Sequence, residues 1–172
     1  MKKALALLVF LCMTVCFARE YITAEKSYVE RIKIGDKYIM LCEFAFTKDL
    51  SSKEVSCDIV LSVYEGVKLV NKINSLSRSD LTEAAAFLKQ MSAISESGNF
   101  KESGCVVKSQ TASEKISAYM FYSDKELLFY IGSSSSRIQI KEIRYVKEFC
   151  VAFESAVDLY DKHFKEFSAI SL

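Results

Sequence analysis

Strict alternation of apolar and polar side chains over residues 38–46 and 55–63 is the feature that most constrains the fold. Successive side chains of a strand point to opposite sides of a sheet, so each run predicts a strand with one buried face. Gly35-Asp36 suits a tight turn and predicts a hairpin between residues 28–34 and the first run. The buried faces comprise Tyr38, Met40, Cys42, Phe44 and Phe46, and then Val55, Cys57, Ile59, Leu61 and Val63.

The spacing of the two runs also predicts how they pair. A chain reversal about residues 49 and 50 puts apolar side chains opposite one another along this face. Residues 67–73 follow as a weaker fourth strand, although their spacing also fits a helix. The predicted pairs are Phe44 with Val55, Cys42 with Cys57, and Met40 with Ile59.

Each run of strands leads into a helix. Residues 77–98 predict the first helix, with a cap at Ser79 or Asp80 and a stop at Gly98. The second half predicts strands at 105–109, 115–122, 126–132 and 137–140, a turn around Asp124, and a helix at 142–167. The last helix has an apolar stripe at Ile143, Val146, Cys150, Phe153, Val157, Tyr160, Phe164 and Phe167.

This order of elements predicts an α+β fold, in which helices cover one side of an antiparallel sheet or sheets. The two halves, 19–98 and 99–172, are similar strand-strand-strand-(strand)-helix units of a single domain, 19–172. They share no residue-level identity, so the similarity is one of architecture.

The first 18 residues have the form of a secretory signal peptide. Lys2 and Lys3 precede an apolar run that ends at Ala18, where cleavage is expected. Lipid attachment at Cys16 and an uncleaved core segment are the alternatives. The run from 4 to 18 is shorter than the roughly 20 residues that a membrane-spanning helix needs, and no later segment is more apolar. We therefore expect a bacterial exported protein, periplasmic or secreted, without a membrane span.

The charge balance bears on the class of partner. The chain carries 23 basic and 22 acidic residues, and loss of Lys2 and Lys3 leaves 21 − 22 = −1. A nearly neutral chain offers no electrostatic footprint for nucleic acid or for an anionic membrane. Neither is expected as a partner.

Four cysteines follow the expected cleavage site: Cys42, Cys57, Cys105 and Cys150. An even number in an oxidising compartment favours two disulfides. The predicted register favours Cys42–Cys57, which leaves Cys105–Cys150 to pin the last helix to its sheet. The alternative is that all four are small buried side chains. Without a CxxC motif, and with one histidine, the chain lacks the usual ligand spacing for zinc.

Candidates for catalysis are few, and no catalytic motif of a known kind is present. His163 is expected at the surface or boundary of the last helix, and Cys150 lies about 20 Å from it along that helix. Glu43 and Asp58 are interpreted as solvated strand residues, with paired acid–base catalysis as the alternative. The serines at 133–136 with Arg137 are interpreted as a flexible connector, with an anion site formed by the hydroxyls and Arg137 as the alternative. No catalytic, cofactor or metal residue is assigned, and no enzyme activity is expected.

The hairpin at 115–131 departs from ordinary patterning because both of its faces are apolar. A sheet covered on one side alternates apolar with polar side chains. One face, expected to meet the helices, carries Ile116, Ala118, Met120, Tyr122, Leu127, Phe129 and Ile131. The other carries Tyr119, Phe121, Leu128 and Tyr130. In the first half the matching face carries Ile39, Leu41, Val60 and Tyr64, interrupted by Glu43 and Asp58.

Two interpretations of the second apolar face stay open: the halves cover each other, or the face is a binding site. The second predicts a small binding protein that acts on a protein partner, for example as an inhibitor, an immunity protein or an envelope-assembly protein, or that forms a homodimer. The expected binding surface is Tyr119, Phe121, Leu128, Tyr130 and Tyr64. The alternative function is a carrier of an apolar small molecule, held in a deep cavity between sheet and helices.

Overall fold

The computed structural model describes residues 23–97, 100, 105–123, 126–133 and 135–170. The predictions for residues 1–18, Gly98 and Asp124 lie outside these residues. The first sheet contains β1 (Thr23–Ile34), β2 (Tyr38–Asp49), β3 (Val55–Glu65) and β4 (Lys68–Leu76), followed by α2 (Arg78–Glu96). The second contains β5 (Val107–Gln110), β6 (Ser117–Ser123), β7 (Glu126–Gly132) and β8 (Arg137–Ile140), followed by α4 (Ile143–Ser168).

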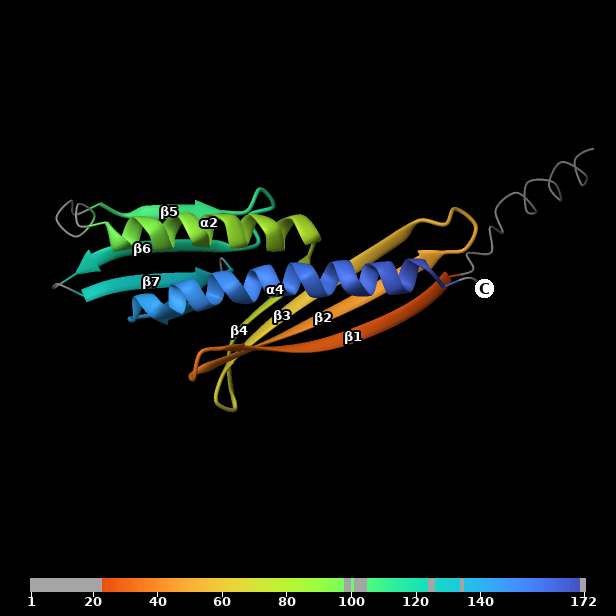
Figure 1. Cartoon of the computed structure of the whole chain (residues 1–172), viewed down its shortest axis with the longest axis horizontal. Helices are drawn as coiled ribbons and strands as arrows, with labels where there is room; N and C mark the ends of the chain where they lie inside the picture. The colour runs from red at the N-terminus through yellow and green to blue at the C-terminus, as the bar shows by residue number, and fades with distance from the viewer. Residues whose placement is uncertain (1–22, 98–99, 101–104, 124–125, 134, 171–172) are drawn as a thin grey trace, which may run out of the picture.

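Two antiparallel sheets and two helices confirm the predicted α+β fold and its repeated order of elements. The strands of each sheet follow one another in chain order, and β4 of the first sheet adjoins β7 and β8 of the second. Figure 1 shows both helices on one side of the sheets, with α4 running along the length of the molecule. α2 packs on α4 and on β5 and β6, whereas α4 reaches from β7 and β8 to β1 and β2. We call the helix side of each sheet its inner face and the other side its outer face.

The inner faces form the hydrophobic core, and the alternation predicted in β2 is confirmed there. The five β2 side chains of the predicted face are at most 3 % exposed. In β3 the predicted face holds for Ile59, Leu61 and Val63, while Val55 and Cys57 are half-buried near the strand's start. β4, predicted as the weaker strand, pairs with β3.

The predicted register between β2 and β3 was wrong by four residues. Phe44 lies opposite Ile59 and Phe46 opposite Cys57. The cause is the loop after Asp49, whose carboxylate accepts hydrogen bonds from the Ser51 and Ser52 amides at 2.7 and 3.1 Å. The loop is longer than a tight reversal at residues 49 and 50, and the longer loop shifts the pairing of β2 with β3. Because side chains alternate with period two, a shift of four residues keeps every side chain on its face.

Helix α2 lies within the predicted range, but its cap comes two residues before the first predicted position. The cap is Ser77, whose hydroxyl accepts a hydrogen bond from the Asp80 amide, while the Asp80 carboxylate accepts one from the Ser77 amide at 2.7 Å. This reciprocal pair satisfies two amides at the start of the helix. Burial alone would raise the pKa of Asp80, but hydrogen bonds from Ser113 and Ser77 outweigh it and hold that pKa below its usual value.

The predicted apolar stripe of α4 was wrong at Phe164 and right at Phe167, which is 1 % exposed. His163, expected at the surface or boundary, is 4 % exposed, while its neighbour Phe164 is 37 % exposed. Ala156, His163 and Phe167 occupy the buried positions of the last turns. These positions are seven and four residues apart, a spacing that fits one face of a helix as well as the predicted stripe does. The contacts of His163 with Glu30 and Tyr28 of β1 favour burial of this face.

The serine run is more than a connector, because it links the two sheets. The Asn71 amide of β4 donates to the Ser136 carbonyl oxygen at 2.5 Å, and Asn71 is 3 % exposed. Gly132, at the end of β7, lies at the same junction. A Cβ there would overlap the Ser136 carbonyl and the Asn71 side chain, so the contact depends on glycine.

Candidate functional site

The outer face of the second sheet brings together four of the five predicted binding-surface residues. Tyr119 lies opposite Tyr130, and Phe121 lies opposite Leu128. The rings of Tyr119 and Tyr130 stack with centroids 4.6 Å apart, and Phe121 lies parallel to both at 6.3 and 6.2 Å. All four side chains are half-buried. We call these four residues the aromatic patch.

The two sheets do not cover each other's outer faces. They adjoin through β4 on one side and β7 and β8 on the other, and both helices lie on the inner side. Within the described residues, no helix or strand packs over the aromatic patch. The rings are partly shielded by one another and by Arg137, whose guanidinium lies 5.2 Å from the centroid of the Tyr119 ring.

Arg137 reaches this ring across a row of small residues. In the register of the sheet, Arg137 of β8 lies opposite Gly132 of β7, which lies opposite Ser117 of β6. The small side chains at these two positions leave room for a long side chain from the next strand. Arg137 therefore lies flat across the outer face and places its charge over an aromatic ring, an arrangement that favours the cation.

An open hollow of about 630 Å³ lies beside the patch. Its walls include the rings of Tyr119 and Phe121 and the charged side chains of Lys108, Arg137 and Glu114. Its volume falls in the range of sites that hold a small ligand or a few side chains of a partner. Arg137, interpreted from the sequence as part of a connector, was not predicted beside Tyr119, and neither was Lys108. Their positions there follow from the registers of β5 and β8.

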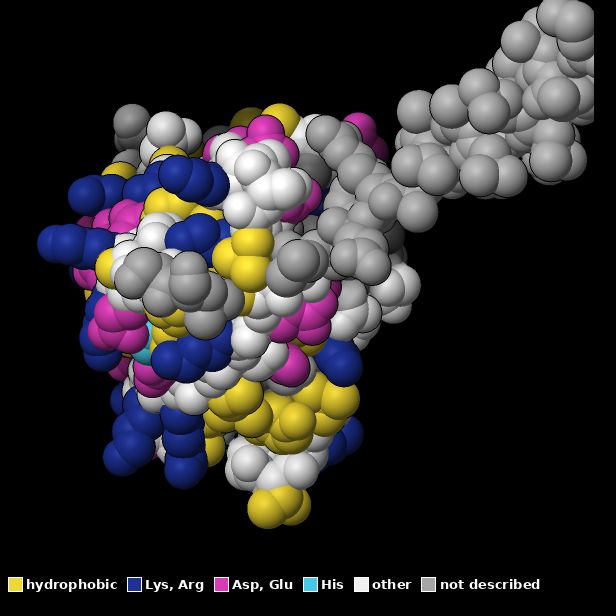
Figure 2. Space-filling model, turned by 90° about the vertical axis from the view of Figure 1, so that its right-hand side faces the viewer, with side chains coloured by type: hydrophobic (Ala, Val, Ile, Leu, Met, Phe, Trp, Pro, Cys, Tyr) yellow, Lys and Arg dark blue, Asp and Glu magenta, His cyan; other side chains and the backbone are white. Residues whose placement is uncertain are grey.

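Tyr64, the fifth predicted residue, lies apart from the patch. It is on the outer face of the first sheet, opposite Ile39 on β2 and Leu69 on β4. No ring contact joins it to the patch among the described residues. Leu69 and Val67 near it are 46 and 101 % exposed. Figure 2 shows hydrophobic side chains gathered at the lower right, toward the end of the molecule formed by the first sheet.

Neither of the two predicted disulfides forms in this structure. Cys42 lies opposite Leu61, and Cys57 lies opposite Phe46, so the predicted Cys42–Cys57 pair is offset by four residues, or about 13 Å along the strand. A disulfide needs Cα atoms within about 7 Å. Cys150, expected to bridge to Cys105, carries a free thiol that donates to the Ala85 carbonyl oxygen at 3.5 Å. Cys105 itself is exposed.

The thiols of Cys42, Cys57 and Cys150 are poor nucleophiles. Burial, together with the charge of Glu30, raises the pKa of Cys42 to about 12. Burial and the charge of Asp58 raise the pKa of Cys57 to about 12. Burial also raises the pKa of Cys150. Because the thiolate is the reactive form, these environments suit packing rather than catalysis.

His163 belongs to a buried contact between the first strand and the last helix. Its Nε2 lies 2.7 Å from a Glu30 carboxylate oxygen and its Nδ1 3.4 Å from one of Glu166. The ring stacks on Tyr28 with centroids 4.0 Å apart. The Cys150 thiol instead donates to the Ala85 carbonyl oxygen of α2, so Cys150 and His163 do not form a nucleophile–base pair. Glu43 and Asp58 are exposed on the outer face, as predicted.

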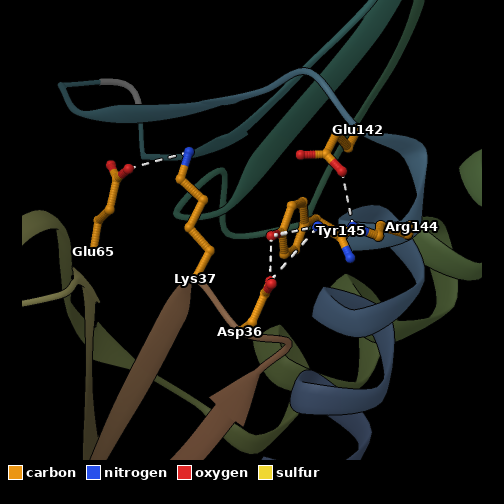
Figure 3. Close-up of polar contacts among 6 residues, drawn as sticks. All are labelled: Asp36, Lys37, Glu65, Glu142, Arg144 and Tyr145. Atoms are coloured by element: carbon orange, nitrogen blue, oxygen red, sulfur yellow. Dashed lines mark hydrogen bonds and ion pairs between the residues drawn. The ribbon is translucent and has the colours of Figure 1, made fainter.

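A second polar cluster holds the β1–β2 turn against the start of α4 (Figure 3). The Tyr145 hydroxyl donates to the Asp36 carboxylate at 2.6 Å, and Arg144 lies 3.7 Å from the same carboxylate. This hydrogen bond lowers the pKa of Asp36 and raises the pKa of Tyr145. Lys37 and Glu65 pair at 3.1 Å beside it. The contacts of Asp36 with Tyr145 and Arg144 join the two halves, and Lys37 with Glu65 pairs within the first half, so we interpret the cluster as structural.

A small hollow lies between the sheets and α4, beside Met40, Asn71 and Phe149. Its volume is about 10 Å³, about the least that one water molecule needs. In the described part of the chain, no group of three or more His, Cys, Asp or Glu side chains has metal-binding geometry. None of the described helices is both long enough and apolar enough to cross a membrane.

Comparisons of the chain with protein-family models, with curated proteins and with solved structures find no match. The candidate site therefore rests on the geometry of the outer face.

Proposed function

We propose that this chain is an exported bacterial binding protein that recognises a protein partner through the aromatic patch. The observation that carries the proposal is the stacked pair of Tyr119 and Tyr130 beside an open hollow, on the face opposite the helices. Tyrosine suits a protein interface because its ring buries area while its hydroxyl tolerates water. An inhibitor, an immunity protein or an envelope-assembly protein would act in this way, in the periplasm or after secretion.

The carrier function receives less support. A carrier needs a deep apolar cavity, and the hollow described between the sheets and α4 holds about one water molecule. The open hollow on the outer face is lined by charged and polar side chains as well as rings. This composition suits the edge of a protein interface better than a site for a wholly apolar molecule.

The experiment is capture of the partner from the cell envelope. The full-length chain, tagged at its C-terminus, is expressed in its host, crosslinked and purified from the envelope fraction. Tyr119→Ala with Tyr130→Ala should remove the crosslinked partner. Val151→Ala with Phe164→Ala, which truncates two exposed apolar side chains of α4, should retain it. Equal capture by both variants would contradict the proposal.

The export part of the proposal has its own test. N-terminal sequencing of the purified chain should begin at Arg19, because the expected cleavage follows Ala18. A modified N-terminal Cys16 would replace the soluble exported form with a lipid-anchored one. Recovery of a chain that begins at Met1 from the cytosol would contradict export.

A further inference from the structure

The hollow beside the aromatic patch has a charge pattern that selects among protein partners. Lys108 lies opposite Tyr119 in the register of β5 and β6, on the same face. Arg137 reaches the same ring from β8, on the other side. On this one face, Tyr119 therefore has Lys108 opposite it on β5 and the guanidinium of Arg137, from β8, over its ring. Neither cation forms an ion pair with another described residue.

One acidic residue, Glu114, also lines the hollow, from the turn before β6. It is exposed, and it has no ion pair to Lys108 or Arg137 within the described residues. Two cations and one anion leave the hollow with an excess of positive charge. A partner that places a carboxylate there gains a charge-assisted hydrogen bond, and an arginine donates it in a two-pronged geometry.

The shape of the partner segment follows from the position of the hollow. Among the described strands β5 is the last of its sheet, so its outward backbone groups face no other described strand. The hollow lies along β5 and β6, and its lining includes Lys108 and Gln110 of β5. An exposed sheet edge pairs readily with an extended chain, whose alternate side chains then enter the pockets on one face.

From these observations we infer that the partner contributes an extended acidic segment, which adds to the β5 edge and places a carboxylate beside Lys108, in the positive field that Lys108 and Arg137 share. A long apolar side chain of that segment, two residues from the carboxylate, extends across β5 toward Tyr119 and Phe121. This inference rests on the proposed function, and it names the chemistry of the partner that the aromatic patch binds.

A random-peptide library displayed on phage tests the inference with the full chain as bait. The selected peptides should carry acidic residues that alternate with aromatic or aliphatic ones. Lys108→Glu with Arg137→Glu should weaken the selected peptides by about tenfold or more. Lys33→Glu with Lys72→Glu, an equal change of charge at exposed positions of the first sheet, should leave their affinity unchanged. N-methylation of alternate peptide amides should abolish binding, since it removes the donors of an added strand.

Selected peptides without acidic residues, or equal binding by both charge variants, would overturn the inference. Binding that survives N-methylation of each alternating set of peptide amides in turn would also overturn it, because one of the two sets must donate to β5 in an added strand. These results are separate from the fate of the proposed function. If Tyr119→Ala with Tyr130→Ala removes the crosslinked partner while the charge variant retains it, the patch binds a protein of other chemistry and the inference fails alone.

Discussion

Two stacked aromatic pairs of nearly equal geometry lie on opposite faces of the two sheets. His163 is 4 % exposed, whereas Tyr28, Tyr119 and Tyr130 are half-buried. The rings of Tyr28 and His163 stack at 4.0 Å on the inner face of the first sheet, beneath α4. The rings of Tyr119 and Tyr130 stack at 4.6 Å on the outer face of the second sheet. The contrast teaches that ring stacking alone does not indicate a role. What lies over the rings decides whether they stabilise the fold or remain available to a partner.

The covered pair is part of a larger aromatic cluster. Phe44 and Phe46 approach the ring of Tyr160, and Phe44 also approaches His163. The Tyr28 hydroxyl is buried without a hydrogen-bond partner among the described residues. Burial of rings on this side outweighs the loss of that hydrogen bond to water, because each large side chain removes much apolar area from solvent.

The largest effect on stability is expected at Phe46, in the covered cluster. Phe46 is 1 % exposed and contacts the rings of Tyr28, Tyr160 and Phe167. Phe46→Ala should lower the free energy of unfolding by about 3–5 kcal/mol, through lost burial and the cavity it leaves. Urea denaturation followed by circular dichroism measures this change. Phe164→Ala, at an exposed neighbouring ring, is the control and should cost much less.

A smaller loss is expected for His163→Ala. The substitution removes the partner of the Glu30 carboxylate and the ring stacked on Tyr28. It should lower the free energy of unfolding by about 1–3 kcal/mol, as for other unsatisfied groups near a core. Lys162→Ala, at an exposed position of the same helix, should be nearly neutral in the same denaturation experiment. Equal stability of the two variants would show that the His163 contact does not hold β1 to α4.

The uncovered pair should matter less for stability. Tyr119→Ala and Tyr130→Ala should each cost about 1 kcal/mol or less, the range of a cross-strand aromatic pair on an open face. Thermal and urea denaturation of each variant give the values. A loss that matches Phe46→Ala would mean that the aromatic patch is covered and belongs to the core, and the comparison between the two pairs would fail.

The smallest effect at neutral pH concerns the thiols of the inner face. Cys42 should resist alkylation until the chain unfolds, whereas a cysteine introduced by Tyr130→Cys should react at once. The folded-state pKa of about 12 exceeds the ordinary value of 9.0. The thiol's contribution to stability is therefore complete below pH 9 and is lost as pH rises toward 12, where the unfolded chain ionises first. Cys42→Ala should flatten that alkaline loss in a pH series of denaturation curves.

Mass spectrometry after alkylation without reductant completes the test. Cys42, Cys57 and Cys150 should all be alkylated once the chain is unfolded, as their free thiols require. A disulfide-linked peptide pair containing Cys42 and Cys57 would contradict the observed register of β2 and β3 and support the pairing predicted from the sequence.

The faces of the strands could be predicted from the sequence, but their registers could not. Alternation with period two specifies which side chains share a face, and a shift of four residues leaves that assignment unchanged. The hydrogen bonds of the Asp49 carboxylate select the longer loop, and a tight turn at 49 and 50 was an equally regular alternative.

The candidate site was predictable in part for the same reason. The aromatic patch followed from the apolar outer positions of one hairpin, at Tyr119 and Tyr130. The cations beside it did not, because Arg137 reaches its ring across Gly132 and Ser117, whose places in one row depend on two registers. The burial of His163 depends likewise on Glu30, more than a hundred residues earlier in the chain.

Hydroxyl-radical footprinting, read by mass spectrometry, compares the two pairs most directly. In the free chain, Tyr119 and Tyr130 should be oxidised faster than Tyr28, and addition of the crosslinked partner or a selected peptide should protect the first two alone. Slow oxidation of all three tyrosines in the free chain, or oxidation of Tyr119 and Tyr130 that the partner leaves unchanged, would contradict the assignment of this face as the binding surface.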